Sequence, residues 1–256
     1  MFKRVWLSEW QRVFKRKKTI VGIIIYLLLV GLEALFLYAV GGVSFYNKDQ
    51  DVLLNNLNTA PFFLRELGMF LVFILIPMFV SDSFNGEYTS GAYRLVLLRP
   101  QGRFMLFIAK LGVQASIVVC LLAATWLIAT AFGIVVFPSV QEVSFYNTIP
   151  LQPLQATIYV LAFYVVAFLV LFAVICVGSA ISSIMPNSIL SYVGTVGFLI
   201  GCTYLSDYFF IFFQVSDTIF EILSQQQLTS LLLIVSLIAI SYIINALVWK
   251  KRDWLG

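Results

Sequence analysis

The sequence predicts an all-α membrane protein with six transmembrane helices, an N-terminal amphipathic interface helix and short re-entrant helices before the last span. Of the 256 residues, 61% are hydrophobic and only 11% are charged, whereas a soluble domain has about 45–50% apolar and about 25% charged residues. The apolar residues also gather in stretches that approach the roughly 20 residues needed to cross a bilayer. Residues 1–256 are therefore expected to form a single transmembrane domain.

Six stretches have the length and apolarity of membrane spans. They run from Thr19 to Val40, Phe62 to Val80, Leu111 to Phe137, Ile158 to Val177, Ser188 to Tyr204 and Leu228 to Val248. The second stretch is interrupted near its start by Arg65 and Glu66. A hairpin that enters the membrane and returns is therefore an alternative for this stretch.

The positions of the basic residues predict the orientation, because cytoplasmic loops carry an excess of Lys and Arg. Of the 16 Lys and Arg residues, all except Lys48 and Arg65 precede the first predicted span, follow the second or follow the sixth. We therefore expect a multi-pass protein of the cell membrane with both termini in the cytoplasm.

Two segments outside the spans have distinct patterns. In residues 1–18, apolar residues recur at spacings of three and four while basic residues lie mostly on other faces, which predicts an amphipathic helix at the cytoplasmic membrane surface. The apolar positions are Phe2, Val5, Trp6, Trp10, Val13 and Phe14. A basic leader that only directs topology is the alternative. Residues 207–227 are too apolar for an open loop and too broken for a seventh span, so short helices that dip into the outer leaflet are expected there.

Most hydrolytic chemistry is excluded by composition. The chain has no histidine, so no Ser-His or Cys-His pair and no histidine metal site can form. The cysteines, Cys120, Cys176 and Cys202, each lie inside an apolar stretch, which gives neither a disulfide framework nor a zinc-binding spacing. We expect no cofactor, no metal and no nucleic-acid partner on this chain.

The most informative segment is the predicted cytoplasmic loop after the second span, residues 81–110. From Asp82 to Lys110 it reads DSFNGEYTSGAYRLVLLRPQGRFMLFIAK. A short apolar turn lies between a Gly and a Pro, which predicts a surface helix that presents an apolar knob flanked by charges to another protein. The residues of this candidate docking site are Glu87, Tyr88, Thr89, Gly91, Arg94, Leu95, Val96, Leu97, Leu98, Arg99, Pro100 and Arg103. The alternative is that the Arg residues only anchor the loop to anionic lipid.

This loop resembles that of ABC type-2 exporter permeases. The resemblance is carried by the run E-Y-T-S-G from Glu87, the apolar turn, Arg99-Pro100, the further basic residue Arg103 and Lys110, which opens the next span. It implies six spans, a cytoplasmic N-terminal interface helix, a coupling helix in this loop and small re-entrant helices before the last span.

The resemblance also implies a division of labour between chains. A separate nucleotide-binding ATPase subunit, which carries ATP and Mg²⁺, would dock on the loop, and a second permease chain, identical or related, would complete the pathway. The sequence agrees with this, because it has no Gly-Lys dipeptide and therefore no phosphate-binding Walker loop. We therefore expect this chain to be a transport subunit and not an enzyme.

Two further sets of residues are candidates for a role inside the membrane. Glu33 and Arg65 are ionisable groups at similar estimated depth, which favours a structural ion pair, with a substrate or ion contact as the alternative. Small residues line one side of the fifth predicted span, where they allow close helix approach: Ser191, Gly194, Gly197 and Gly201. Packing within the chain is favoured there over a seam between two chains.

The substrate class is only weakly indicated. A pathway lined by Phe, Leu and Ile suits a hydrophobic or amphipathic cargo, such as a peptide, an antimicrobial compound or a lipid. Two other classes of function are alternatives. An intramembrane, rhomboid-like protease would need Ser179 as its nucleophile, and the absence of histidine opposes it. A channel or a scaffold without transport activity is opposed only by the family resemblance.

Overall fold

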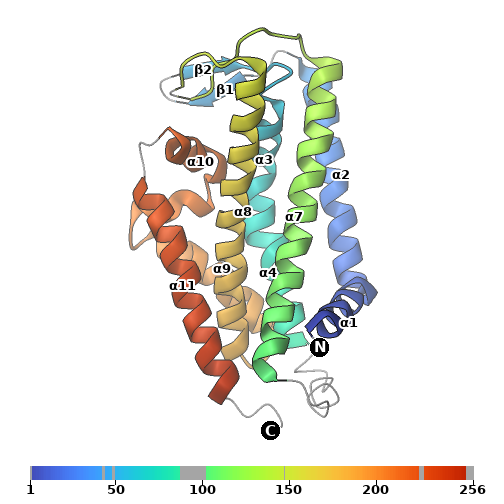
Figure 1. The fold of residues 1–256 in the computed structure, drawn as a ribbon, viewed down its shortest axis with the longest axis vertical. Helices are drawn as coiled ribbons and strands as arrows, with labels where there is room; N and C mark the ends of the chain where they lie inside the picture. The colour runs from blue at the N-terminus through green and yellow to red at the C-terminus, as the bar shows by residue number, and fades with distance from the viewer. Residues whose placement is uncertain are drawn as a thin grey trace.

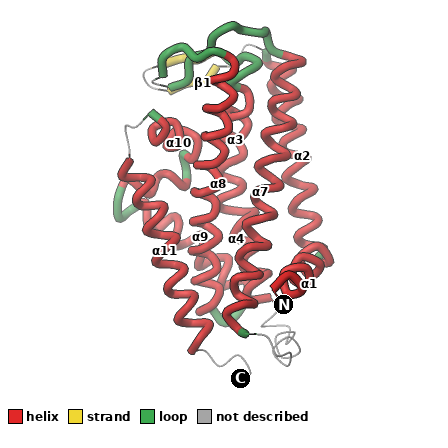
Figure 2. The backbone as a smooth tube through the Cα atoms, in the orientation of Figure 1, coloured by secondary structure: helices red, strands yellow, loops and turns green. Residues whose placement is uncertain are grey.

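The computed structural model describes residues 2–41, 44–47, 50–86, 102–146, 148–224 and 228–251. Long helices lie side by side along the longest axis, a small β-hairpin covers one end, and a short helix lies across the other end (Figure 1). Figure 2 shows that helices make up nearly all of the described chain and that the strands are confined to the hairpin. The all-helical character predicted from composition is confirmed.

Five helical stretches in the described part of the chain are long and apolar enough to cross a membrane. They are α2 (Lys17–Val40), the stretch Thr59–Gly86, α7 (Arg103–Val136), α8 (Pro153–Ile184) and α11 (Leu228–Lys251). The stretch Thr59–Gly86 consists of α3 (Thr59–Phe70), the π-helix η1 (Leu71–Leu75), α4 (Ile76–Ser81) and the π-helix η2 (Asp82–Gly86). Helix α9 (Ser188–Thr203) is apolar but has only 16 residues.

The third predicted span begins earlier than the sequence indicated. We predicted that residues 81–110 form a loop and that the span starts at Leu111, but helix α7 already begins at Arg103. The physical reason is that Lys110 is not a solvated loop residue. Its side chain is fully buried and pairs with Glu9, so its charge does not end the apolar helix.

The segments at the hairpin end connect the long helices. Strands β1 (Ser44–Asn47) and β2 (Gln50–Leu53) pair antiparallel with Ser44 opposite Leu53. The sequence pattern did not predict this hairpin. The segment predicted to hold short helices contains the 3₁₀-helix η3 (Asp207–Phe212) and α10 (Val215–Leu223). Helix α10 is tied to the second stretch by Ser216, whose hydroxyl donates to the carbonyl of Pro61 over 3.2 Å.

Helix α8 lies at the centre of the bundle, in contact with α4, α7, α9 and α11. Its junction with α11 is polar. The Asn245 amide donates to Ser179 Oγ over 2.9 Å and accepts from Ser183 Oγ over 3.0 Å, while Trp249 Nε1 donates to Ser183 Oγ over 3.0 Å. Such hydrogen bonds hold helices together in lipid, where apolar surface gives no net preference for helix contact over lipid contact.

Helix α1 (Phe2–Lys15) packs against the first turns of α7. Val5, Glu9 and Val13, spaced four residues apart, form its buried face. The ring of Trp6 lies directly on Gly112, whose missing side chain leaves the space for it. Residues Phe2–Lys15 of the predicted segment 1–18 are thus helical, and this helix has a buried carboxylate that the apolar pattern did not reveal.

Candidate functional site

The predicted docking segment lies mostly outside the described residues. Glu87, Tyr88, Thr89, Gly91, Arg94, Leu95, Val96, Leu97, Leu98, Arg99 and Pro100 are not described, whereas Arg103 is the first residue of α7. The structure does describe both ends of this segment. They are η2 before it and the first turns of α7 after it, and both lie at the same end of the bundle as α1 (Figure 1).

A buried ion pair joins the two ends of the segment to helix α1. Lys110 Nζ lies 3.0 Å from Glu9 Oε2 and also donates to the carbonyl oxygen of Ser83 over 3.0 Å. The side chains of Lys110 and Glu9 are 0% and 1% exposed. Glu9 is further held by Arg12, whose Nη1 lies 2.6 Å from Oε1. One ammonium group thus contacts α1 and the chain on both sides of residues 87–101.

A second, less buried set of contacts lies beside it. Asp82, the first residue of η2, accepts from Arg16 over 3.1 Å and lies 3.5 Å from Lys18 Nζ. Arg16 occupies the corner between α1 and α2. On the other side of η2, the Asn85 amide donates to the carbonyl of Met185 over 2.8 Å, in the turn between α8 and α9. The end of the second stretch is therefore fixed to both neighbours.

The regular hydrogen bonding of the second stretch is broken at a proline, although the chain is helical on both sides of it. Pro77 has no backbone N–H, so the carbonyl of Phe73, four residues earlier, cannot accept the usual helical hydrogen bond. The hydroxyl of Tyr192 in α9 donates to that carbonyl over 3.2 Å. Just before the proline the helix is a π-helix, in which Ile76 N–H donates to the carbonyl of Leu71, five residues back. Helical irregularities of this kind occur frequently at functional sites.

An apolar groove follows this irregular part of the second stretch. Its volume is about 320 Å³, and it is lined by Met69, Phe70, Phe73, Ile74, Val196, Ile200 and Phe213. The rings of Phe73 and Phe213 lie 4.6 Å apart between centroids. We refer to it as the α9 groove. It offers an aromatic surface beside a π-helical turn in which the carbonyl of Phe73 accepts a hydrogen bond from the side chain of Tyr192.

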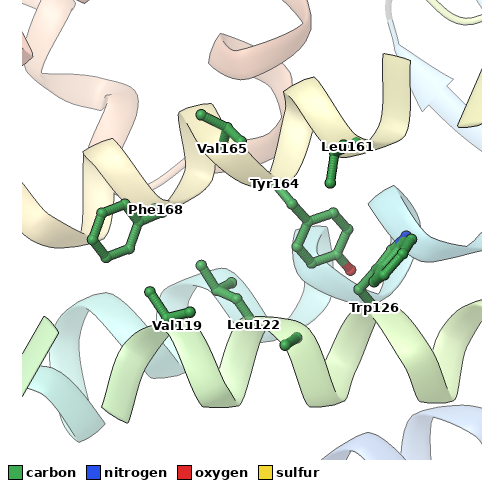
Figure 3. A pocket seen from close by; sticks show the side chains of 8 residues that line it. Val119, Leu122, Trp126, Leu161, Tyr164, Val165 and Phe168 are labelled. Carbon is green, nitrogen blue, oxygen red and sulfur yellow. The ribbon is translucent and has the colours of Figure 1, made fainter. Parts of the chain in front are cut away.

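A groove of similar size, about 330 Å³, lies between α7 and α8. Figure 3 shows Val119, Leu122 and Trp126 on one helix directed toward Leu161, Tyr164 and Phe168 on the other. The hydroxyl of Tyr164 donates to the carbonyl of Ala60 over 2.9 Å. The Tyr164 hydroxyl is the one hydroxyl among the residues that line this groove, and it is already hydrogen bonded to α3. Unlike the second stretch, the two helices α7 and α8 that line the groove contain no π-helical turn.

Comparison with known families decides the class of protein. Residues 7–200 match the ABC-2 family transporter protein. The chain belongs to the ABC-2 transporter family. No curated protein is similar enough in sequence to be matched with it. Together with the apolar helices, membership makes this ABC-2 chain a multi-pass membrane protein and a transport permease, and the family implies partnership with an ATP-binding subunit.

The ion pair that the sequence suggested inside the membrane is not formed in this ABC-2 chain. Arg65 Nε lies 4.0 Å from Asp217 Oδ1 in α10, and among the described residues no ion pair joins Arg65 to Glu33. The Oε1 atom of Glu33 is buried without a hydrogen-bond partner there. The prediction of a Glu33–Arg65 pair was wrong because it assumed regular helices. It also did not anticipate that α10 packs against α3 and supplies Asp217 as the partner of Arg65.

The small residues of α9 divide into two groups. Ser191 is buried and its hydroxyl hydrogen bonds with that of Ser182 in α8. A side chain at Gly194 would lie 3.2 Å from Ile181, also in α8. Side chains at Gly197 and Gly201 would meet nothing within 4 Å. The first two residues therefore pack within the chain, whereas the last two face away from it.

Sequence reasoning missed several residues of these sites. Glu9 was hidden within an apolar stripe, and its role depends on a partner 101 positions away. Tyr192 gave no signal of its own. Pro77, inside a predicted span, was a usable signal for the break in the second stretch. The protease alternative finds no support, because Ser179 is fully buried, donates to the carbonyl of Cys176 and accepts from Asn245.

Proposed function

We propose that this chain is the permease subunit of an ABC exporter. It forms the pathway for a hydrophobic or amphipathic substrate, of the class of a peptide, an antimicrobial compound or a lipid, and a separate nucleotide-binding subunit drives it. The observation that carries the proposal is the continuity of the second stretch. The same run of helix lines the α9 groove at Phe73 and ends at Gly86, where the docking segment begins.

The proposed topology has six crossings. Helix α1 and the end of α11 lie at the same end of the bundle (Figure 1), so the chain must cross an even number of times. At 1.5 Å per residue, α9 is about 24 Å long, shorter than the roughly 30 Å of a bilayer core. We take α9, continued by η3 and α10 as re-entrant helices in the outer leaflet, as the fifth crossing. Helix α1 then lies at the cytoplasmic surface as the interface helix, and both termini are cytoplasmic.

The proposed pathway uses the α9 groove and a second permease chain. The groove is apolar and open on one side, and Met69 and Ile74 on its rim are 49% and 46% exposed. A second chain, identical or related, would close it. An aromatic wall suits an amphipathic cargo, since rings contact both acyl chains and apolar side chains without fixed hydrogen-bond geometry. Glu33, with its unpartnered carboxylate oxygen, remains a candidate for a polar contact outside the groove.

The proposed source of energy is a nucleotide-binding subunit that docks on the segment from Glu87 to Arg103. ATP and Mg²⁺ are carried by that subunit, and this chain supplies no nucleotide site. The apolar turn Leu95–Leu98 would fill a pocket on the partner, and the flanking charges would set its orientation. This assignment is supported by the family and by the sequence of the segment.

The test uses the tagged chain purified with its nucleotide-binding subunit and reconstituted in liposomes. The probes are a fluorescent phospholipid and a fluorescent amphipathic dye, each measured for ATP-dependent movement. Phe73→Ala removes the ring at the centre of the α9 groove. Phe168→Ala is the matched control, because it removes the same ring from the groove between α7 and α8. A variant with Ser at residues 95–98 tests docking.

The proposal expects Phe73→Ala to lower movement of at least one probe several-fold while recovery of the nucleotide-binding subunit is unchanged. Phe168→Ala should retain wild-type movement, and the Ser variant should lose the subunit. Equal recovery of the subunit with the wild-type chain and the Ser variant would exclude docking on this segment. Equal loss of movement in both Phe variants would exclude a specific role for the α9 groove.

A further inference from the structure

We propose that Glu9 and Lys110 are positioning residues for energy coupling. Their buried ion pair fastens helix α1 to both ends of residues 87–101, so that a displacement of this segment is carried into α1 and the start of α2. The inference rests on the proposed function, because it names the route by which motion of a docked nucleotide-binding subunit would leave the segment.

The first argument is the burial of the pair. Lys110 and Glu9 have almost no exposed side-chain surface, and their charged atoms lie 3.0 Å apart. A buried charge is tolerated only while its partner and hydrogen bonds are present, and removing one partner leaves the other uncompensated. Separation of α1 from α7 would take the Glu9 carboxylate away from Lys110 and leave Glu9 with Arg12 as its ion-pair partner. The pair therefore makes α1 and the start of α7 move as one body.

The second argument is the position of Lys110. Its ammonium group also donates to the carbonyl of Ser83, which lies in η2, four residues before Glu87. The two ends of the docking segment therefore meet at one charged atom, and α1 is held at the same atom through Glu9. The Lys110 ammonium group therefore contacts α1 and η2 directly.

The third argument is that α1 is tightly packed against α7. A methyl group at Gly112 would lie 2.1 Å from the ring of Trp6, so the ring already fills the space above that residue. At the far end of α1, Arg16 contacts Asp82 over 3.1 Å. The corner between α1 and α2 is thereby held to η2 as well. Movement of the segment reaches α2 through contacts at both ends of α1.

A purely structural role for the pair is the competing explanation, and the molecule contains an internal comparison. Asn85, also in η2, donates to the carbonyl of Met185 in the turn between α8 and α9. This second route is independent of Glu9 and Lys110. If the pair couples the elements, its loss should abolish the nucleotide-dependent structural change in α1 and the start of α2. The nucleotide-dependent change in the α8–α9 turn should be retained. Loss of a merely structural contact would disturb both or neither.

The experiment uses the complex of this chain with its nucleotide-binding subunit in lipid nanodiscs. Hydrogen–deuterium exchange of peptides covering residues 2–25 and 180–195 is compared between the nucleotide-free state and the state trapped with MgATP and vanadate. The test variant is Glu9→Cys/Lys110→Cys, in a background with Ala at positions 120, 176 and 202. This variant removes both charges of the pair, so neither is left buried without the other. A bifunctional thiol reagent can cross-link its two cysteines. Lys15→Met, an exposed charge loss on the same helix, is the control.

The wild-type chain and Lys15→Met should show a nucleotide-dependent difference in both peptides. The unbridged cysteine variant should retain ATP hydrolysis and the difference in residues 180–195, and should lose the difference in residues 2–25. Cross-linking the two cysteines should restore the difference in residues 2–25. The proposal is overturned if the unbridged variant keeps the difference in residues 2–25, if bridging does not restore it, or if the wild-type chain shows none. Failure to recover any nucleotide-binding subunit with the wild-type chain would instead overturn the proposed function, and this inference with it.

Discussion

Gly112→Ala is the sharpest test of how α1 is packed. The added methyl group would lie 2.1 Å and 2.4 Å from two atoms of the Trp6 ring, closer than carbon atoms can approach. The ring is half-buried and also contacts Phe2, with 5.9 Å between ring centroids. Either the ring must turn out of its site or α1 must lift from α7. The same substitution at Gly31 meets nothing within 4 Å, so this glycine provides the matched control.

The two substitutions should change stability in opposite directions. Overpacking of a filled site costs about 1–3 kcal/mol, which exceeds the gain of about 1 kcal/mol that replacing Gly by Ala gives in a helix. Gly112→Ala should therefore be destabilising, and Gly31→Ala should be neutral or stabilising by up to about 1 kcal/mol. For a chain of this size a change of 1 kcal/mol moves the unfolding midpoint by about 2–4 °C.

The assay is thermal unfolding in detergent, followed by reaction of a thiol-reactive fluorophore with Cys176, which is buried in the folded chain. Cys120 is exposed and is replaced by Ala beforehand. Trp6→Ala removes the ring, so the double variant Trp6→Ala/Gly112→Ala should lose less stability than the sum of the single changes. A midpoint for Gly112→Ala equal to that of Gly31→Ala, or strictly additive losses, would refute the packing of α1 described above.

Three further predictions concern other parts of the chain. Gly197→Ile and Gly201→Ile place bulk on the open side of α9 and should weaken self-association in mass photometry without lowering the unfolding midpoint; unchanged association would exclude this side as the seam. Asp217→Asn removes the carboxylate that lies 4.0 Å from Arg65 Nε and should lower the unfolding midpoint by the equivalent of at most about 1 kcal/mol, as for a partly exposed ion pair; a rise in the midpoint would show that this pair does not stabilise the fold. A cysteine at Thr148 should react with an impermeant thiol reagent in intact cells, whereas one at Gln101 should not; labelling at Gln101 would overturn the orientation.

Helix ends could be predicted where apolarity falls along the sequence. The ends of α2, α9 and α11 lie within about three residues of the predicted ends for this reason. The start of α7 was placed eight residues too late, at Leu111 in place of Arg103. A lysine normally marks the end of a span, and only its partner in the folded chain changes that interpretation.

The candidate sites were harder to predict because they depend on pairs that are distant in sequence. Arg65 was assigned to Glu33 by counting residues along two straight helices, whereas the fold places Asp217 within 4.0 Å of it. The partner comes from α10, a helix whose position depends on tertiary packing. The break at Pro77 was visible in the sequence, but not the hydroxyl of Tyr192 that satisfies the carbonyl of Phe73. Local chemistry could therefore be predicted, and the partner could not.

The kinds of contact differ between the two halves of the molecule, and this difference has a mechanical consequence. At the α1 end, elements are joined by charged contacts, of which the pair between Glu9 and Lys110 is buried. Inside the bundle, most described polar contacts between helices are neutral, such as the hydroxyls of Tyr26 and Thr125, 2.6 Å apart, and the bond from Tyr192 to Phe73. The exception is the pair between Arg65 and Asp217, whose atoms lie 4.0 Å apart. A neutral hydrogen bond contributes about 1 kcal/mol net and can exchange partners, whereas breaking a buried ion pair costs about 3–5 kcal/mol. Under a force applied at residues 87–101, the neutral contacts are therefore expected to yield first. The α1 end would tilt as one body, and rearrangement would occur at Phe73, beside the α9 groove.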